Sequence, residues 1–166
     1  MRHRIDAAQN VSRMCLVCGV ENGAGLKGRF FELESGELAG VFQVRKEHQG
    51  YPGRLHGGMI SAILDETIGR AIRITRPDDW GVTAELTVRY RHPVPTEGEI
   101  RAVGRITRDT RRLFEGTGEI VLDDGTVAVE AKGRYVKLGI GAITGDDFDV
   151  SDWVPDERER PEEVDI

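Results

Sequence analysis

The sequence has no long hydrophobic run, few cysteines and few aromatic residues. Its 166 residues are 39% hydrophobic and 31% charged, a composition typical of a folded globular domain. No segment contains the roughly 20 consecutive apolar residues that a membrane-spanning helix requires, so we expect no membrane partner. The first residues, Met1 to Asp6, lack the apolar run that follows the charges of a secretory signal. We therefore expect a cytoplasmic protein.

The sequence also lacks an excess of positive charge, and its negative charge is concentrated near the C-terminus. The whole chain has a net charge of −6, and the segment after Gly145 holds ten acidic and two basic residues, a charge of −8. The preceding residues are therefore only slightly basic. A nucleic-acid-binding surface needs a strong basic patch, so we expect no nucleic-acid partner. Individual arginines of the body still suit a phosphorylated small molecule.

The only two cysteines form one pair, Cys15-Leu16-Val17-Cys18, which Gly19 follows. Such a pair occurs in half of a zinc site or in a redox pair. Structural zinc takes four ligands, but no second CxxC or HxxxH pair follows, and nothing marks out His3 as a third ligand. We therefore favour two reduced thiols in an N-terminal turn, with no bound metal.

The pattern of strands and turns predicts one domain between two flanking segments. Residues 1–26 are interpreted as a lead-in, residues 27–138 as the main domain, and residues 139–166 as an acidic tail. Because the tail has little apolar content, we expect it to be partly disordered, with Trp153 docking locally. Six strand-like runs are expected in the main domain, at 27–34, 37–45, 81–90, 99–107, 112–122 and 126–138.

One helix is expected between the second and third of these runs, over about residues 58–76, where apolar residues recur at helical spacing until Pro77. Almost its whole circumference is apolar or small, so other structure must cover it. One antiparallel sheet that curls around the helix is the simplest arrangement. We therefore predict an α+β protein with the hot-dog fold, in which one long central helix is wrapped by a curved antiparallel β-sheet.

The strongest indications of chemistry lie on this helix. Gly57 and Gly58 open it and leave backbone N–H groups unobstructed at the positive end of the helix dipole. Such groups polarise a carbonyl oxygen, although glycines at this position also simply allow the sheet to approach. Asp65 lies among small residues of a mostly buried helix, where a carboxylate is costly without a partner or a chemical role. Glu66, turned about 100° away, is interpreted as a solvated or salt-bridged acid.

The spacing of these residues indicates a site shared between subunits. Gly58 and Asp65 are about 10 Å apart along the helix, at 1.5 Å per residue. A carbonyl bound at Gly58 is therefore too far from Asp65 of the same chain. Two antiparallel helices across a two-fold axis bring Asp65 of one subunit to Gly58 of the other. We expect a homodimer, or a homotetramer formed as a dimer of dimers.

The run His56-Gly57-Gly58, with Asp65 nine residues after the histidine, resembles the motif of the hot-dog acyl-CoA thioesterase superfamily, in its PaaI-like branch. Residues 83–95 are similar to the central strand of that family, and the similarity covers about residues 15–138. The resemblance implies hydrolysis of an acyl-CoA thioester to a free acid and CoA. It implies no cofactor, since coenzyme A is part of the substrate.

The resemblance also implies roles for individual residues. Asp65 would act as nucleophile or as general base, while Gly58 of the partner subunit polarises the thioester carbonyl. His56 would shape the start of the helix, and Thr83 would assist the water or the carboxylate. The candidates for substrate binding are Gly57, together with Gln49 or Gly50, which occupy a position where many relatives have Asn.

The CoA phosphates need cations near the pocket mouth. Arg111 and Arg112 are the candidates, although solvated surface charge is an equally good interpretation of both.

Two other functions stay open at this point. A hot-dog enoyl-thioester hydratase or dehydratase would use His48 and Glu66, and a non-catalytic acyl-CoA-binding protein would need no catalytic carboxylate. The sequence leaves the acyl chain undefined, because Met59, Ile63 and Tyr51 suit an aryl or an aliphatic pocket.

Overall fold

The computed structural model describes residues 1–147 and 149–166. Its strands and helices, in chain order, are β1 (Arg2–Ala8), β2 (Val11–Ser12), β3 (Arg29–Leu33), β4 (Leu38–Gln43), α1 (Gly57–Ala71), β5 (Trp80–Tyr90), β6 (Glu99–Asp109), β7 (Leu113–Val121), β8 (Val127–Leu138), α2 (Ile140–Thr144), β9 (Trp153–Val154) and β10 (Glu163–Asp165). Short 3-10 turns occur at Lys46–His48, Ile72–Ile74, Gly145–Asp147 and Val150–Asp152.

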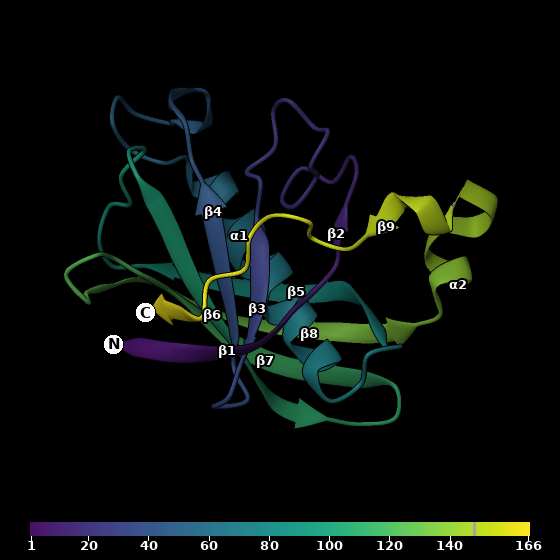
Figure 1. Cartoon of the computed structure of the whole chain (residues 1–166). Coiled ribbons are helices and arrows are strands. Elements are labelled where there is room, and N and C mark those ends of the chain that lie inside the picture. The colour runs from purple at the N-terminus through teal and green to yellow at the C-terminus, as the bar shows by residue number, and fades with distance from the viewer. Residues whose placement is uncertain (148) are drawn as a thin grey trace.

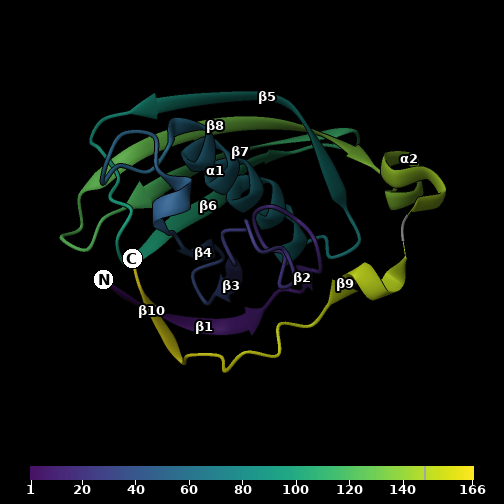
Figure 2. The ribbon, with the colours of Figure 1, turned by 90° about the horizontal axis from the view of Figure 1, so that it is seen from above.

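Eight strands form one antiparallel sheet in the order β10-β1-β3-β4-β6-β7-β8-β5. The sheet curves around α1, as Figure 1 and Figure 2 show from two directions. The two remaining strands, β2 and β9, pair with each other. The predicted arrangement of one long helix wrapped by a curved antiparallel sheet is confirmed.

Helix α1 packs its apolar face into the concave side of the sheet. Ile60, Ile63, Leu64 and Ile68 are buried there, in the same core cluster as aromatic side chains of the strands. Their spacing of three and four residues places them on one face of the helix. The helix ends at Ala71, earlier than the expected 76, because the chain tightens into the 3-10 turn Ile72–Ile74 before Pro77.

Close contact between the sheet and α1 depends on glycines in the central strands. A Cβ atom at Gly104 of β6 would lie 2.6 Å from the backbone oxygen of Thr67 in α1. At Gly118 of β7, a Cβ atom would lie 2.7 Å from a side-chain carbon of Ile68. The backbone of α1 therefore rests almost directly on the sheet, which fixes the depth at which the helix sits.

The two flanking segments also belong to the sheet. Strand β1 pairs with β3, and β10 pairs with β1 at the sheet edge. Val164 of β10 is buried in a second apolar cluster with Ile5, Phe31 and Val41, among others. Figure 1 shows that the N- and C-terminal strands lie side by side.

The expectation of a partly disordered tail is therefore wrong for its described residues. The tail has few apolar residues, but Trp153 contacts Trp80 edge to face, with 5.1 Å between the ring centroids. One of its acids also ties the tail to the sheet: the Asp156 carboxylate accepts hydrogen bonds from Arg29 of β3 and from Arg158, and it is almost fully buried. The local docking expected for Trp153 is confirmed.

None of the helices in the described part of the chain has the length and apolar character needed to span a bilayer.

The contact between Gly104 and α1 gives a test of the packing. We expect Gly104→Ala to lower the free energy of unfolding by about 1–3 kcal/mol, because the added methyl group meets backbone that cannot rotate away. Gly23→Ala is the matched control, since a Cβ atom there meets nothing within 4 Å and the residue has no positive φ. Urea unfolding followed by circular dichroism measures both. Equal stability of the two variants would contradict this packing.

Candidate functional site

Asp65 lies in the middle of α1, partly exposed, with two hydroxyl groups directed at its carboxylate. The Thr83 hydroxyl donates to it from 2.9 Å (Oδ1) and 3.1 Å (Oδ2). The Tyr135 hydroxyl lies 3.1 Å from Oδ1 and 3.0 Å from the main-chain oxygen of the same residue. Two neutral donors therefore fix the orientation of the carboxylate, and no lysine or arginine in the described part of the chain forms an ion pair with it.

The sheet brings the two hydroxyl groups together. Thr83 of β5 and Tyr135 of β8 are directly opposite each other in the antiparallel ladder, and opposite residues share one face of the sheet. The register shifts by one residue between Thr83 and Glu85, a β-bulge of the kind that re-aims side chains near functional sites. The Tyr135 ring is 1% exposed and stacks on Phe114 at 4.9 Å, so its hydroxyl has little freedom to move.

Burial raises the pKa of Asp65 above the usual aspartate value. The hydrogen bonds from Thr83 and Tyr135 act in the opposite direction, and the neighbouring charge of Glu66 adds a smaller increase. The outcome is a carboxylate that is more basic than a solvated aspartate. A raised pKa suits a group that must take up a proton or attack a carbon atom near neutral pH.

Asp65 opens into a pocket of about 200 Å³. One wall is formed by the aromatic rings of Trp80 and Trp153 with the guanidinium groups of Arg70 and Arg73. The Arg73 guanidinium lies 4.5 Å from the centroid of the Trp80 ring, and that of Arg70 lies 4.6 Å from the Trp153 ring. The tail thus contributes a side chain to the pocket that contains the carboxylate.

The start of α1 is capped by the predicted histidine. His56 is the N-cap residue, and its Nδ1 atom accepts the Gly58 N–H at 2.9 Å. The Tyr90 hydroxyl of β5 donates to the Gly57 carbonyl at 2.8 Å. His56 therefore shapes the start of the helix by capping it. Its imidazole accepts the hydrogen bond of the Gly58 N–H, the group that was predicted to bind the substrate.

The loop before the helix is held mainly by its own backbone. The Gln49 side chain accepts the Gly53 N–H at 3.3 Å, and Gly50 lies against the His56 ring, where a Cβ atom would come within 3.2 Å. Of the two loop candidates, Gly50 is thus nearer to the histidine, while the Gln49 amide oxygen binds within its own loop.

The candidate arginines do not lie together in one pocket. Arg111 lines a pocket of about 640 Å³ that shares Asp79 and Trp80 with the Asp65 pocket. Arg112 is absent from the described lining residues of that pocket, and its carbonyl accepts the Lys137 N–H. Arg111 is therefore the better placed of the two to meet a ligand that extends from Asp65.

Two residues of the site were not identified from the sequence. Tyr135 gave no signal beyond its place in the last expected strand, because a tyrosine in a strand is commonly a packing residue. Trp153 was expected to dock locally, but the sequence did not show that it docks at the pocket beside Asp65. That position depends on the path of the tail in space.

The part of the chain that carries these residues is similar to a known protein family. Residues 52–129 match the sequence model of the thioesterase superfamily. This part of the chain belongs to the thioesterase superfamily. The matched residues include α1 and β5, and thus His56, Gly58, Asp65 and Thr83. The family expected from the His-Gly-Gly motif is confirmed.

The similar curated proteins include acyl-coenzyme A thioesterase THEM4 of the mouse, Mus musculus, which is 28% identical over 120 residues, 71% of this chain and 51% of the relative. The same enzyme of cattle, Bos taurus, is 27% identical over 137 residues, 81% of this chain and 54% of the relative. The chain thus spans about half the length of the curated relatives that it matches.

Solved structures confirm the hot-dog fold. A crystal structure of a thioesterase superfamily protein is 30% identical, with a TM-score of 0.69 over 76% of this chain and 61% of that chain. The PaaI protein of Escherichia coli is 15% identical, with a TM-score of 0.62 over 69% of this chain and 81% of that protein. At that identity the likeness concerns the fold alone.

The raised pKa of Asp65 predicts how stability depends on pH. Because its pKa is higher in the folded state than in the unfolded state, the favourable contribution of Asp65 is complete below the unfolded-state pKa and is lost as the pH rises through the folded-state pKa. Asp65→Asn, which stays neutral, should therefore melt at a higher temperature than the parent protein at pH 7. This advantage should shrink as the pH falls to about 4.

Scanning calorimetry across that pH range measures the difference, with Glu97→Gln, an exposed carboxylate changed to an amide, as the control. An advantage of Asp65→Asn that grows on acidification would show that the folded state lowers the pKa of Asp65 instead.

Proposed function

We propose that the protein hydrolyses an acyl-CoA thioester to the free acid and CoA. The observation that carries the proposal is the Asp65 carboxylate, which is half-buried, held by two neutral hydroxyls and open to a pocket. A carboxylate in this setting is more basic and more precisely oriented than one in water. Membership of the thioesterase superfamily and the acyl-CoA thioesterase named among the relatives support this choice of substrate.

In the proposed reaction, Asp65 either attacks the thioester carbonyl carbon or takes a proton from the attacking water. Thr83 and Tyr135 hold the carboxylate in the orientation that either role needs. The N-terminus of α1 stabilises the negative charge that develops on the carbonyl oxygen. For this, the Gly58 N–H exchanges its bond to His56 Nδ1 for a bond to the substrate oxygen. Side chains and backbone supply every group, so the hydrolytic step needs no cofactor.

A homodimer completes the proposed site, because Gly58 and Asp65 lie on one helix, about 10 Å apart along its axis. Strand β5 supports this assembly: it lies at the edge of the sheet, and in the described chain it pairs only with β8. Val82 and Tyr90 of this strand are 39% and 50% exposed. A long open edge with apolar side chains is a surface that proteins usually cover. Two-fold pairing there, as a dimer or a dimer of dimers, would bring two α1 helices together.

In the proposed complex, the acyl thioester of the substrate lies at Asp65. Its CoA phosphates lie toward Arg111, in the adjoining pocket. The proposed ligand is thus a small molecule, and the proposed place of action is the cytoplasm. The hydratase alternative loses support, because His48 is buried with both ring nitrogens bonded to backbone atoms of Arg45 and Ala24. Glu66, its partner in that alternative, forms an ion pair with Arg70 at 2.7 Å.

Hydrolysis can be tested with a panel of short, long and aromatic acyl-CoAs, read by the released thiol. We expect turnover of at least one of them with EDTA present. Asp65→Asn should lower kcat by about 10²-fold or more, with little change in KM, because it removes the reacting charge and keeps the shape. Glu97→Gln should retain the parent rate. A fully active Asp65→Asn enzyme would refute the assignment of Asp65, and binding of acyl-CoA without turnover by the parent protein would favour a non-catalytic function.

A further inference from the structure

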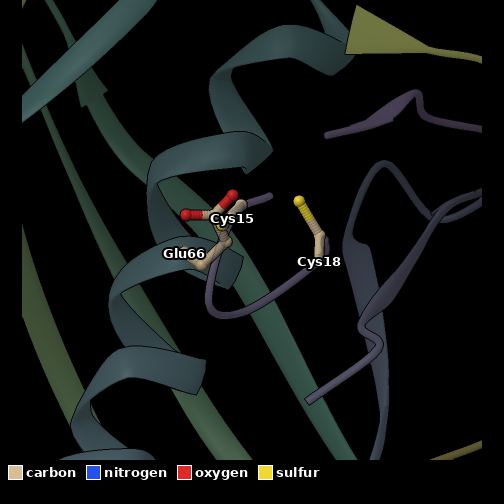
Figure 3. A group of neighbouring side chains, drawn as sticks. All are labelled: Cys15, Cys18 and Glu66. Carbon is tan, nitrogen blue, oxygen red and sulfur yellow. The ribbon is translucent and has the colours of Figure 1, made fainter. Parts of the chain in front are cut away.

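A second cluster of reactive side chains lies beside the carboxylate, on a different side of α1. The turn between β2 and β3 carries Cys15 and Cys18, and it packs against α1 at Glu66. The two Sγ atoms and one carboxylate oxygen of Glu66 all lie within 4.8 Å of one another. Figure 3 shows the three side chains converging from the turn and the helix. Cys18 is buried, while Cys15 and Glu66 are partly exposed.

One buried arginine supplies positive charge to this cluster. Arg70 is 6% exposed, and it donates from Nη2 to Cys18 Sγ at 3.0 Å and from Nε to Glu66 Oε1 at 2.7 Å. With both cysteines as thiolates, the form in which they bind metals, the two sulfurs and Glu66 carry three negative charges against one positive charge of Arg70. The remaining charge of −2 is the charge that a divalent cation balances.

We propose that Cys15, Cys18 and Glu66 bind one zinc ion, with water as the fourth ligand. Two sulfurs and one oxygen suit zinc, whereas calcium and magnesium prefer oxygen ligands alone. Bonds of about 2.3 Å to sulfur and about 2.1 Å to oxygen at a tetrahedral zinc place the ligand atoms about 3.5–3.8 Å apart. The three atoms lie within 4.8 Å of one another, so binding requires them to approach by up to about 1 Å. Binding releases the two thiol protons to water.

Backbone N–H groups of the turn and of β2 already donate to the sulfurs. The Val17 N–H donates to Cys15 Sγ at 3.3 Å, and the Ser12 N–H donates to Cys18 Sγ at 3.4 Å. Such outer-shell donors, with Arg70, orient metal ligands and stabilise their charge. The zinc would tie the N-terminal turn to α1 next to Asp65. The zinc would take no part in the proposed hydrolytic step, which uses Asp65, the residue before Glu66. Its role would be to stabilise the fold.

The test uses the full chain, purified under reducing conditions and titrated with Zn²⁺ against a chromophoric chelator. We expect one zinc per chain and a melting temperature that rises with zinc. Cys15→Ser, Cys18→Ser and Glu66→Gln should each weaken zinc binding by more than the roughly 10–100-fold that the loss of an outer-shell partner costs. Asp65→Asn is the matched control: it changes the adjacent carboxylate on the same helix and should retain zinc while it loses activity.

Co²⁺ in place of Zn²⁺ gives a readout that a general loss of stability cannot imitate. Two thiolate ligands should produce sulfur-to-cobalt charge-transfer absorption in the parent protein, which should weaken in each single cysteine variant. A folded parent protein that binds neither metal in competition with the chelator would overturn the proposal. So would equal zinc affinity in the Glu66→Gln and parent proteins, or a Cys15–Cys18 disulfide that forms readily in zinc-saturated protein, which would indicate a redox pair.

Discussion

The hydrogen bonds from Thr83 and Tyr135 to the Asp65 carboxylate are the interaction on which the rest of the site depends. They require β5 and β8 to be paired in one register, with the bulge after Thr83, and they require α1 to lie close to the sheet. The glycines beneath α1 permit that approach. The fold thus holds a half-buried carboxylate between two neutral hydroxyl donors. The burial that makes its charge costly to stability also raises its pKa.

Much of this arrangement could be predicted from the sequence, for a physical reason. The period of apolar residues determines which face of an element is buried, so α1, the strand runs and the hot-dog arrangement followed from local pattern. Asp65 stood out because a charge among small residues of a buried helix needs an explanation. Tyr135 and Trp153 did not stand out, because their partners are distant in the chain. The order of the tail was missed because it comes from the pairing of β10 with β1, a few ion pairs and Trp153. None of these is visible in the average composition of the segment.

Arg70 connects parts of the molecule that the sequence alone leaves separate. It bonds to Glu66 and Cys18, and its guanidinium lies over the Phe30 and Trp153 rings. The tail, the cysteine turn and the helix that carries Asp65 thus share one buried cation. Because the loss of a buried charge partner is strongly destabilising, this side of α1 should behave as a single cooperative unit. The zinc site that we propose would reinforce this unit, whereas the opposite part of the helix faces the proposed dimer contact.

The proposed reaction requires the N-terminus of α1 from one subunit and Asp65 from the other to form a single site. The decisive measurement mixes two inactive variants, Asp65→Asn and Gly58→Ala, under conditions of confirmed subunit exchange. A shared site predicts restored hydrolysis, because each mixed dimer has one site with both parental residues, and about half of the dimers are mixed. If activity does not recover in dimers whose subunit exchange has been verified, the shared site is contradicted.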